Sequence, residues 1–155
     1  MQVTATEDVA APIDHVFAEL TAFDAIERQV LRRGIDVRRK FRTPMPKPGD
    51  GWEAQFRFRG KERTATVELL QFDAPQHLQF AGASGGLETT TQIDLVPLSP
   101  NRTRVTVAFK MSPKTLSARL LVQSFKLVRS RINTRFRDRM AQYAREIEAK
   151  LVKSA

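Results

Sequence analysis

The stretch VAAPIDHVFAEL, residues 9–20, marks a change from strand to helix near the start of the chain. Up to this point Val3, Ala5, Glu7 and Val9 follow one another at every second position, as on one face of a strand. Pro12, with its fixed φ and missing N–H, suits the first turn of a helix. The apolar residues that follow have the i, i+3, i+4, i+7 spacing of one helix face: Ile13, Val16, Phe17 and Leu20. The stretch therefore predicts a short first strand followed at once by a helix.

The same stretch contains three polar residues that could form an acid/base cluster, Asp14, His15 and Glu19. Because the apolar face of the helix would point to the core, these residues would lie mostly on the opposite side. Asp14 falls in the first turn, where the helix dipole favours a carboxylate. His15 and Glu19 are four residues apart and predict a surface pair. We therefore interpret the group as part of a helix start and look for function elsewhere.

Two further patterns follow this helix. A second short helix is predicted from Phe23 to Leu31, and Gly34 marks its end. From Ile35 to Met111 apolar and polar side chains then alternate, which predicts an antiparallel sheet covered on one face only. Turn residues divide this region into six strands, centred on residues 35–41, 52–58, 63–69, 78–80, 87–95 and 105–111.

The final segment, from about Ser112 to Lys153, contains no glycine and only one proline, Pro113. Its apolar residues recur at steps of three or four, which predicts one long amphipathic helix. Such a helix of about 38 residues would span about 57 Å, which exceeds the width of a domain of this size. Part of the helix would then overhang the sheet or be broken.

The composition limits the classes of function. The length of 155 residues suits one domain, spanning 1–155. With no cysteine and two histidines, neither thiolate chemistry nor a metal site is expected. No uncharged run approaches the roughly 20 residues needed to cross a bilayer, and the chain does not open on a signal-peptide pattern. We therefore expect a cytoplasmic protein without a transmembrane segment.

The net charge of +9 is unevenly distributed. Residues 1–110 hold 15 Lys/Arg and 14 Asp/Glu, whereas residues 111–155 hold 11 and 3. In the stretch RSRINTRFRDR, residues 129–139, the arginines would surround a helix rather than form one patch. A solvated helix surface is the simpler interpretation, and contact with an anionic membrane or with nucleic acid remains the alternative.

The predicted order of elements resembles the START/polyketide-cyclase-like (SRPBCC) superfamily, whose helix-grip fold is also seen in the birch-pollen allergen. The stretch VAAPIDHVFAEL looks like the strand-Ala-Pro-helix opening of that family, and VELLQFDAPQHLQF, residues 67–80, looks like its strand-Pro-strand. The resemblance implies an α+β fold in which a curved seven-stranded antiparallel sheet surrounds the C-terminal helix and leaves a ligand cavity. Members bind sterols, lipids, plant hormones or polyketides, and a minority catalyse cyclisation or dehydration, so the fold does not decide the function.

Strand parity predicts which side chains face inward, whether they pack as a core or line a cavity. The candidate cavity-lining residues are Arg39, Phe41, Trp52, Phe56, Phe58, Arg63, Phe80, Thr89, Thr91, Val107, Phe109, Leu121, Phe125 and Val128. The resemblance favours a cavity, as do polar residues on the inward face, which need partners when buried. Arg39 and Arg63 either pair with Glu7 or reach the rim, or they hold the carboxylate or phosphate end of an amphipathic ligand.

These observations predict a protein that binds a hydrophobic or amphipathic small molecule, such as a lipid, a sterol or a polyketide. The first alternative is a cyclase- or aromatase-type enzyme that uses the same cavity, and no residue is singled out as catalytic. The second alternative is an interaction module that uses the basic C-terminal helix. We expect no cofactor, no metal and no specific nucleic-acid partner, and a monomer or weak homodimer.

Overall fold

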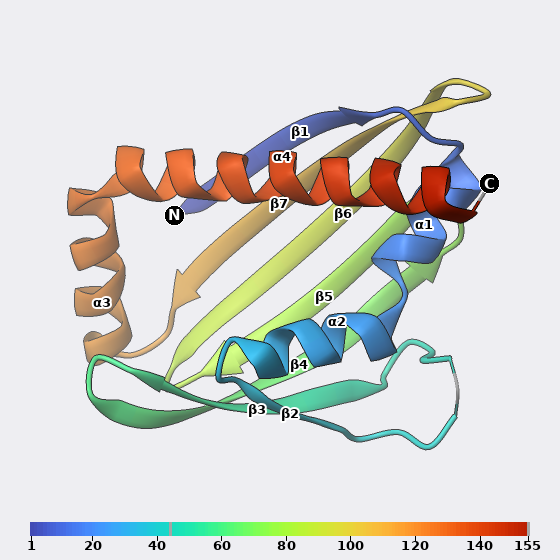
Figure 1. The fold of residues 1–155 in the computed structure, drawn as a ribbon. Coiled ribbons are helices and arrows are strands. Elements are labelled where there is room, and N and C mark those ends of the chain that lie inside the picture. The colour runs from blue at the N-terminus through green and yellow to red at the C-terminus, as the bar shows by residue number, and fades with distance from the viewer. Residues whose placement is uncertain (44, 155) are drawn as a thin grey trace.

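The computed structural model describes residues 1–43 and 45–154. These residues form seven strands and four helices, joined by turns and loops (Figure 1). In chain order they are β1 (Gln2–Val9), α1 (Ile13–Leu20), α2 (Phe23–Arg32), β2 (Asp36–Arg39), β3 (Gly51–Phe58), β4 (Lys61–Asp73), β5 (His77–Ser84), β6 (Leu87–Ser99), β7 (Arg102–Pro113), α3 (Leu116–Leu127) and α4 (Arg129–Ser154). This order confirms the predicted first strand, two short helices and six further strands.

All the strands belong to one antiparallel sheet with the order β1-β7-β6-β5-β4-β3-β2. In the strand register, one row of directly paired residues crosses the sheet from β3 to β7. The row consists of Trp52, Val67, Gly82, Thr89 and Met111. Because side chains alternate along each strand, the residues of such a row point to the same side of the sheet. The sheet therefore has an inner face, which the helices cover, and an outer face.

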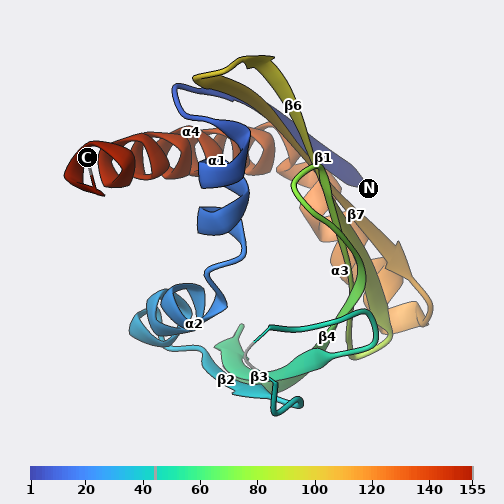
Figure 2. The same cartoon turned by 90° about the vertical axis from the view of Figure 1, so that its right-hand side faces the viewer.

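The sheet curls, and α1, α2 and α4 all lie on its hollow side (Figure 2). α4 contacts β1, α1 contacts β6 and β7, and α2 contacts β2. The buried core between sheet and helices consists of Val9, Ala11, Val16, Phe17, Phe23, Trp52, Leu69, Leu78, Leu95, Val105, Ala144 and Ile147. This arrangement confirms the α+β helix-grip fold, with the last helix packed on the concave face.

The C-terminal segment differs from the single helix that its apolar spacing predicts. β7 continues as far as Pro113, and the helical part is broken at Val128 into α3 and α4. Thr115 caps the start of α3, and its side chain accepts a hydrogen bond from the Ala118 N–H. α3 lies across the end of the sheet, whereas α4 runs back along β1 (Figure 1). Of the two outcomes that the length of the segment suggested, the break is therefore the one observed.

The opening stretch attaches the start of the chain to α4. Asp14 lies in the first turn of α1, as predicted. The predicted surface pair is wrong, because the His15 ring nitrogen Nε2 lies 3.2 Å from the Ile147 carbonyl oxygen. Glu19 forms an ion pair of 3.1 Å with Lys150. Both side chains thus reach α4, which a pattern confined to one helix does not reveal.

Candidate functional site

The inner face contains an aromatic cluster beneath α2, centred on the buried Trp52. The Trp52 ring lies 5.1 Å from Phe23, 5.3 Å from Phe41 and 6.3 Å from Phe80, measured between ring centroids. Edge-on and tilted ring pairs of this kind add about 0.5–1.5 kcal/mol beyond the burial of their area. The structure thus brings the predicted residues Phe41, Trp52 and Phe80 together as packed core.

Arg39, a predicted ligand anchor, is neutralised by α2. Its Nε donates to Glu27 Oε1 at 2.6 Å, its Nη2 donates to Asp24, and the same Glu27 oxygen accepts the Trp52 indole N–H at 2.9 Å. The hydrogen bond to Glu27, followed by the charges of Glu27 and Asp24, raises the pKa of Arg39. The predicted pairing with Glu7 is therefore replaced by two carboxylates of α2, which join β2 to that helix.

A second, smaller cluster lies at the other end of the inner face, beneath α3. Phe58 and Phe125 meet edge to face at 6.5 Å. Arg63 donates through Nε to the Phe58 carbonyl oxygen at 3.2 Å and lies over the Phe58 ring. Arg59 lies over both rings and donates to Ser124 Oγ at 3.2 Å. Like Arg39, Arg63 has partners in the protein, but these are a carbonyl and a ring rather than a carboxylate.

The remaining predicted residues lie between these clusters or at their border. Half-buried side chains on the strands are Phe56, Thr89, Thr91, Val107 and Phe109. On the helical segment, Leu121 is half-buried in α3, and Val128 at the break is exposed. Between the two aromatic clusters the inner face is thus only partly covered.

An apolar void of about 30 Å³ remains where α4 crosses β1 and β7. Its lining consists of Ala5, Glu7, Val9, Leu20, Val105, Val107, Met140, Tyr143, Ala144 and Ile147. Glu7 is the only charged residue among them, and Val107 is the only predicted cavity-lining residue. The void shows that α4 does not pack completely against the inner face at this point.

A cleft of about 400 Å³ lies between α2 and α4, which face the same hollow side of the sheet in both views (Figures 1 and 2). Its lining consists of Gln29, Arg32, Arg33, Arg139, Met140, Gln142, Tyr143 and Glu146. The sequence prediction missed this group, because its members come from helices more than 100 positions apart. The one available signal was Arg139, which falls almost on the apolar stripe of its helix.

Tyr143 borders both the cleft and the void. Its hydroxyl donates to the Glu19 carbonyl oxygen at 3.3 Å. Burial, followed by the nearby charges of Glu19 and Glu146, raises the pKa of Tyr143 to about 12. The phenol therefore stays protonated at neutral pH and acts as a hydrogen-bond donor that links α4 to α1.

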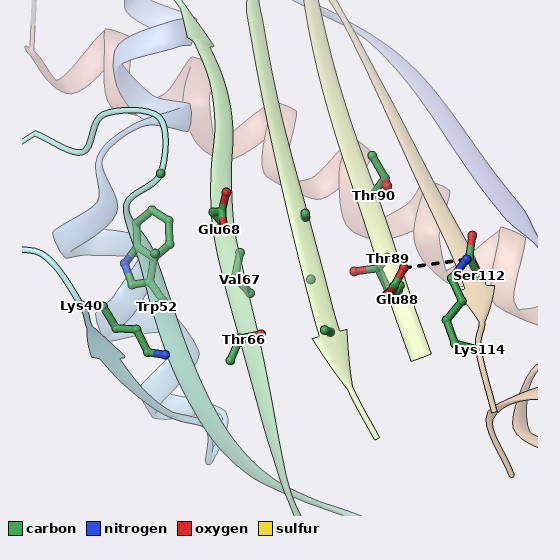
Figure 3. A pocket seen from close by; sticks show the side chains of 15 residues that line it. Lys40, Trp52, Thr66, Val67, Glu68, Glu88, Thr89, Thr90, Ser112 and Lys114 are labelled. Carbon is green, nitrogen blue, oxygen red and sulfur yellow. Dashed lines mark ion pairs between the residues drawn. The ribbon is translucent and has the colours of Figure 1, made fainter. Parts of the chain in front are cut away.

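A groove of about 630 Å³ lies on the other side of the sheet (Figure 3). Most of its side chains belong to rows that alternate with the inner rows, such as Thr66, Ala83, Glu88 and Ser112. Glu88 pairs with Lys114 at 3.9 Å, which joins β6 to the residue that follows the neighbouring strand β7. This surface is separate from the predicted cavity, although Trp52 and Thr89 border both sides.

Outside these sites, the titratable side chains include one close histidine–carboxylate pair. His77 Nδ1 lies 2.6 Å from Asp94 across the β5–β6 pair, which joins two strands. In residues 1–43 and 45–154, His, Cys, Asp and Glu side chains nowhere form a group of three that could hold a metal ion. The same residues contain no helix that is long and apolar enough to span a membrane.

Comparison with solved structures shows the same fold at low sequence identity. The protein TTHA0849 from Thermus thermophilus matches with a TM-score of 0.66 at 12% identity, covering 100% of this chain and 99% of that one. A START superfamily protein from Mycobacterium smegmatis matches with a TM-score of 0.57 at 14% identity, covering 86% and 95%. The Zhui aromatase/cyclase from Streptomyces sp. R1128 matches with a TM-score of 0.56 at 16% identity, covering 74% and 69%. At these identities the matches establish the fold alone.

No curated protein sequence shows significant similarity to this chain. The model of one sequence family, described as polyketide cyclase / dehydrase and lipid transport, matches residues 1–148. This match covers all seven strands and reaches into the last turns of α4. The chain belongs to the polyketide cyclase/dehydrase and lipid transport family.

Proposed function

We propose that this protein binds a hydrophobic or amphipathic small molecule against the inner face of its sheet, with entry between α2 and α4. The observation that carries the proposal is the partial cover of that face. Phe56, Val107 and Phe109 point inward by strand parity but stay only half-buried after folding.

The hydrophobic effect explains why a partly covered inner face favours an apolar ligand. Each Å² of apolar surface that a ligand removes from water contributes about 25 cal/mol. The void beside Val107 and the cleft between α2 and α4 share Met140 and Tyr143 in their walls, which is why we place entry at this point. Family membership supports the same class of ligand, since the family description includes lipid transport and polyketide chemistry.

The single tryptophan of the chain makes the proposal directly testable. Trp52 lies on the inner face, next to Phe80, so a bound ligand should change its fluorescence. We expect saturable binding of dodecanol, and Phe56→Gln should weaken it by about tenfold, because a polar amide replaces apolar contact area. Circular dichroism and a thermal melt establish that the variant is folded.

Leu98→Gln provides the matched control, because Leu98 is an exposed apolar residue near the β6–β7 turn. The control should bind dodecanol like the wild type. Absence of saturable binding, or an equal loss in both variants, would contradict the proposal. Incubation with a linear polyketone adds a second readout, since a binder returns it unchanged and a cyclase releases a cyclised product.

A further inference from the structure

Three arginines converge at the cleft between α2 and α4. Arg32 and Arg33 end α2, and Arg139 faces them from α4. All three are exposed, and none of their side chains forms an ion pair or hydrogen bond with another residue in the described ranges 1–43 and 45–154. Glu146 is the only acidic residue in the cleft wall. The cleft therefore carries an excess of positive charge.

Arg39 differs from these three arginines, because its charge is paired with carboxylates of the protein. Arg39 has two carboxylate partners from α2, Glu27 and Asp24. Arg32 and Arg33 are favoured at the end of α2, where a cation interacts well with the helix dipole. That reason does not extend to Arg139, which lies inside α4, and its repulsion with the two other arginines is opposed in the cleft wall by a single carboxylate, that of Glu146. An external anion would remove this repulsion.

The cationic cleft leads into apolar surroundings. Met140 and Tyr143 line both the cleft and the void between α4 and the sheet. On one side of these two residues lie the arginines, and on the other lie apolar residues such as Val105 and Val107. A ligand that extends from the cleft towards this void would combine an anionic head with an apolar tail.

We propose that the ligand is an anionic amphiphile, with its carboxylate or phosphate head held by Arg32, Arg33 and Arg139 and its tail on the inner face. This inference rests on the proposed function and names the class of ligand. Guanidinium groups bind carboxylate and phosphate through paired, charge-assisted hydrogen bonds, and Gln29 and Gln142 in the same wall add amide donors. Arg39 and Arg63, the anchors predicted from strand parity, are already engaged within the protein.

The test compares ligands with one tail and different heads. Dodecyl phosphate, dodecanoate and dodecanol are titrated while Trp52 fluorescence is recorded, and calorimetry repeats each titration. We expect the two anions to bind at least about tenfold more tightly than the alcohol. The triple variant Arg32→Gln, Arg33→Gln, Arg139→Gln should lose this preference while its affinity for dodecanol stays unchanged.

The matched control is Arg131→Gln, Arg135→Gln, Arg137→Gln, which removes the same charge from α4 outside the cleft. The control should keep the anion preference. Equal losses in both triple variants would show a general charge effect and overturn the proposal, as would equal affinity of the wild type for all three ligands. Inorganic phosphate that binds as tightly as dodecyl phosphate would make the cleft a free-anion site and would also overturn it.

The outcome for dodecanol separates this inference from the proposed function. If dodecanol binds and the two anions bind no more tightly than it does, the proposed function stands and only the proposed head group is wrong. If neither the alcohol nor the anions bind, the proposed function and this inference both fail.

A second, independent observation concerns the outer face of α3. Leu116, Leu120 and Leu127 are 74%, 64% and 87% exposed. Their spacing of four and seven residues places them on one stripe of the helix. Arg119 and Lys126 are exposed beside this stripe. The helix thus presents apolar and basic residues together to solvent, while its opposite face packs through Ala118 and Val122.

The surrounding charge indicates what could cover this stripe. Burial lowers the pKa of the Met1 amino group, and the nearby charges of Lys126, Arg129 and Lys110 lower it further. A second copy of the chain would bring these like charges together, so self-association through α3 is opposed. We infer that α3 docks on an anionic lipid surface, with the leucines inserted and the basic residues near the head groups.

Vesicle flotation tests this docking. The wild type should float with vesicles of phosphatidylcholine and phosphatidylglycerol, stay behind with pure phosphatidylcholine, and detach as salt is raised. Leu120→Asn with Leu127→Asn should abolish flotation. Val96→Asn with Leu98→Asn, which alters exposed apolar residues of β6, should leave it unchanged.

Three results would overturn the docking proposal. One is flotation of the α3 variant with the anionic vesicles. Another is a dimer in sedimentation velocity that the α3 variant converts to a monomer, because the stripe would then be a contact between copies. The last is binding to a DNA fragment that competes with the vesicles and depends on the same leucines.

Discussion

The two ends of the inner face are built from the same sheet but are covered differently. Near α1 the face is closed by three helices, and Leu69, Leu78 and Leu95 are almost completely buried. Near α3 the cover is that one helix, whose Phe125 forms an edge contact with Phe58 of β3. α3 itself leaves its leucines in water.

This difference teaches how one fold combines a stable region with an adaptable one. At the closed end, α1, α2 and α4 bury apolar residues and also pair polar ones, such as Glu27 with Arg39 and Glu19 with Lys150. At the other end, folding removes less apolar surface of the inner face from water, because few helical residues cover it. Free energy of folding should therefore be concentrated near α1, and exposed apolar surface near α3.

The largest effect is expected from Leu78→Ala at the closed end. Leu78 is 0% exposed, and truncating a buried leucine costs about 2–5 kcal/mol of unfolding free energy. Leu120→Ala, in the exposed stripe of α3, is the comparison and should change stability by about 0.5 kcal/mol or less. Urea unfolding followed by Trp52 fluorescence measures both. Equal losses in the two variants would break the proposed division of the inner face.

Glu27→Ala should have the next largest effect, about 1–3 kcal/mol, since it leaves the half-buried Arg39 and the Trp52 N–H without their shared acceptor. Glu27→Gln keeps an oxygen for one of them and should cost less. Urea unfolding of both variants measures the two losses. A Glu27→Ala protein as stable as the wild type would show that the carboxylate does not join α2 to the sheet.

Raising the pH should weaken the closed end through Tyr143. Its pKa in the folded protein is about 12, whereas an unfolded tyrosine has a pKa of about 10. A raised pKa contributes stability that is fully present below pH about 10 and is lost as the pH rises towards about 12, by about 1 kcal/mol near pH 11. Tyr143 is the only tyrosine, so its ultraviolet titration reports this pKa directly. A midpoint near 10 would contradict the burial of the phenol between α4 and α1.

The smallest effect is expected from Phe125→Ala at the α3 end. Because Phe125 is half-buried and packs edge to face on Phe58 outside the buried core cluster, its loss should cost about 1 kcal/mol or less. Leu78→Ala at the closed end, which should cost about 2–5 kcal/mol, is again the comparison. Thermal unfolding of both variants measures the ratio. Similar costs would mean that the two ends are equally well packed.

Part of the candidate site could be predicted from alternation along the strands. Trp52 and Phe80 share the helix-covered face as strand parity predicts, and they meet at 6.3 Å. Parity also placed Arg39 on that face but could not identify its partners. Those lie 12 and 15 positions earlier, in α2, and their contact depends on how that helix rests on β2.

By itself, the sequence determined the order of the elements and the apolar side of each, because helix and strand periods are local properties of the chain. It also placed Asp14 in the first turn of α1. Only the tertiary structure decided the break at Val128, the attachment of His15 to α4, and the meeting of Arg32 and Arg33 with Arg139. These features join residues far apart in the chain or change the direction of a helix, so they depend on the curl of the sheet and the crossing of the helices.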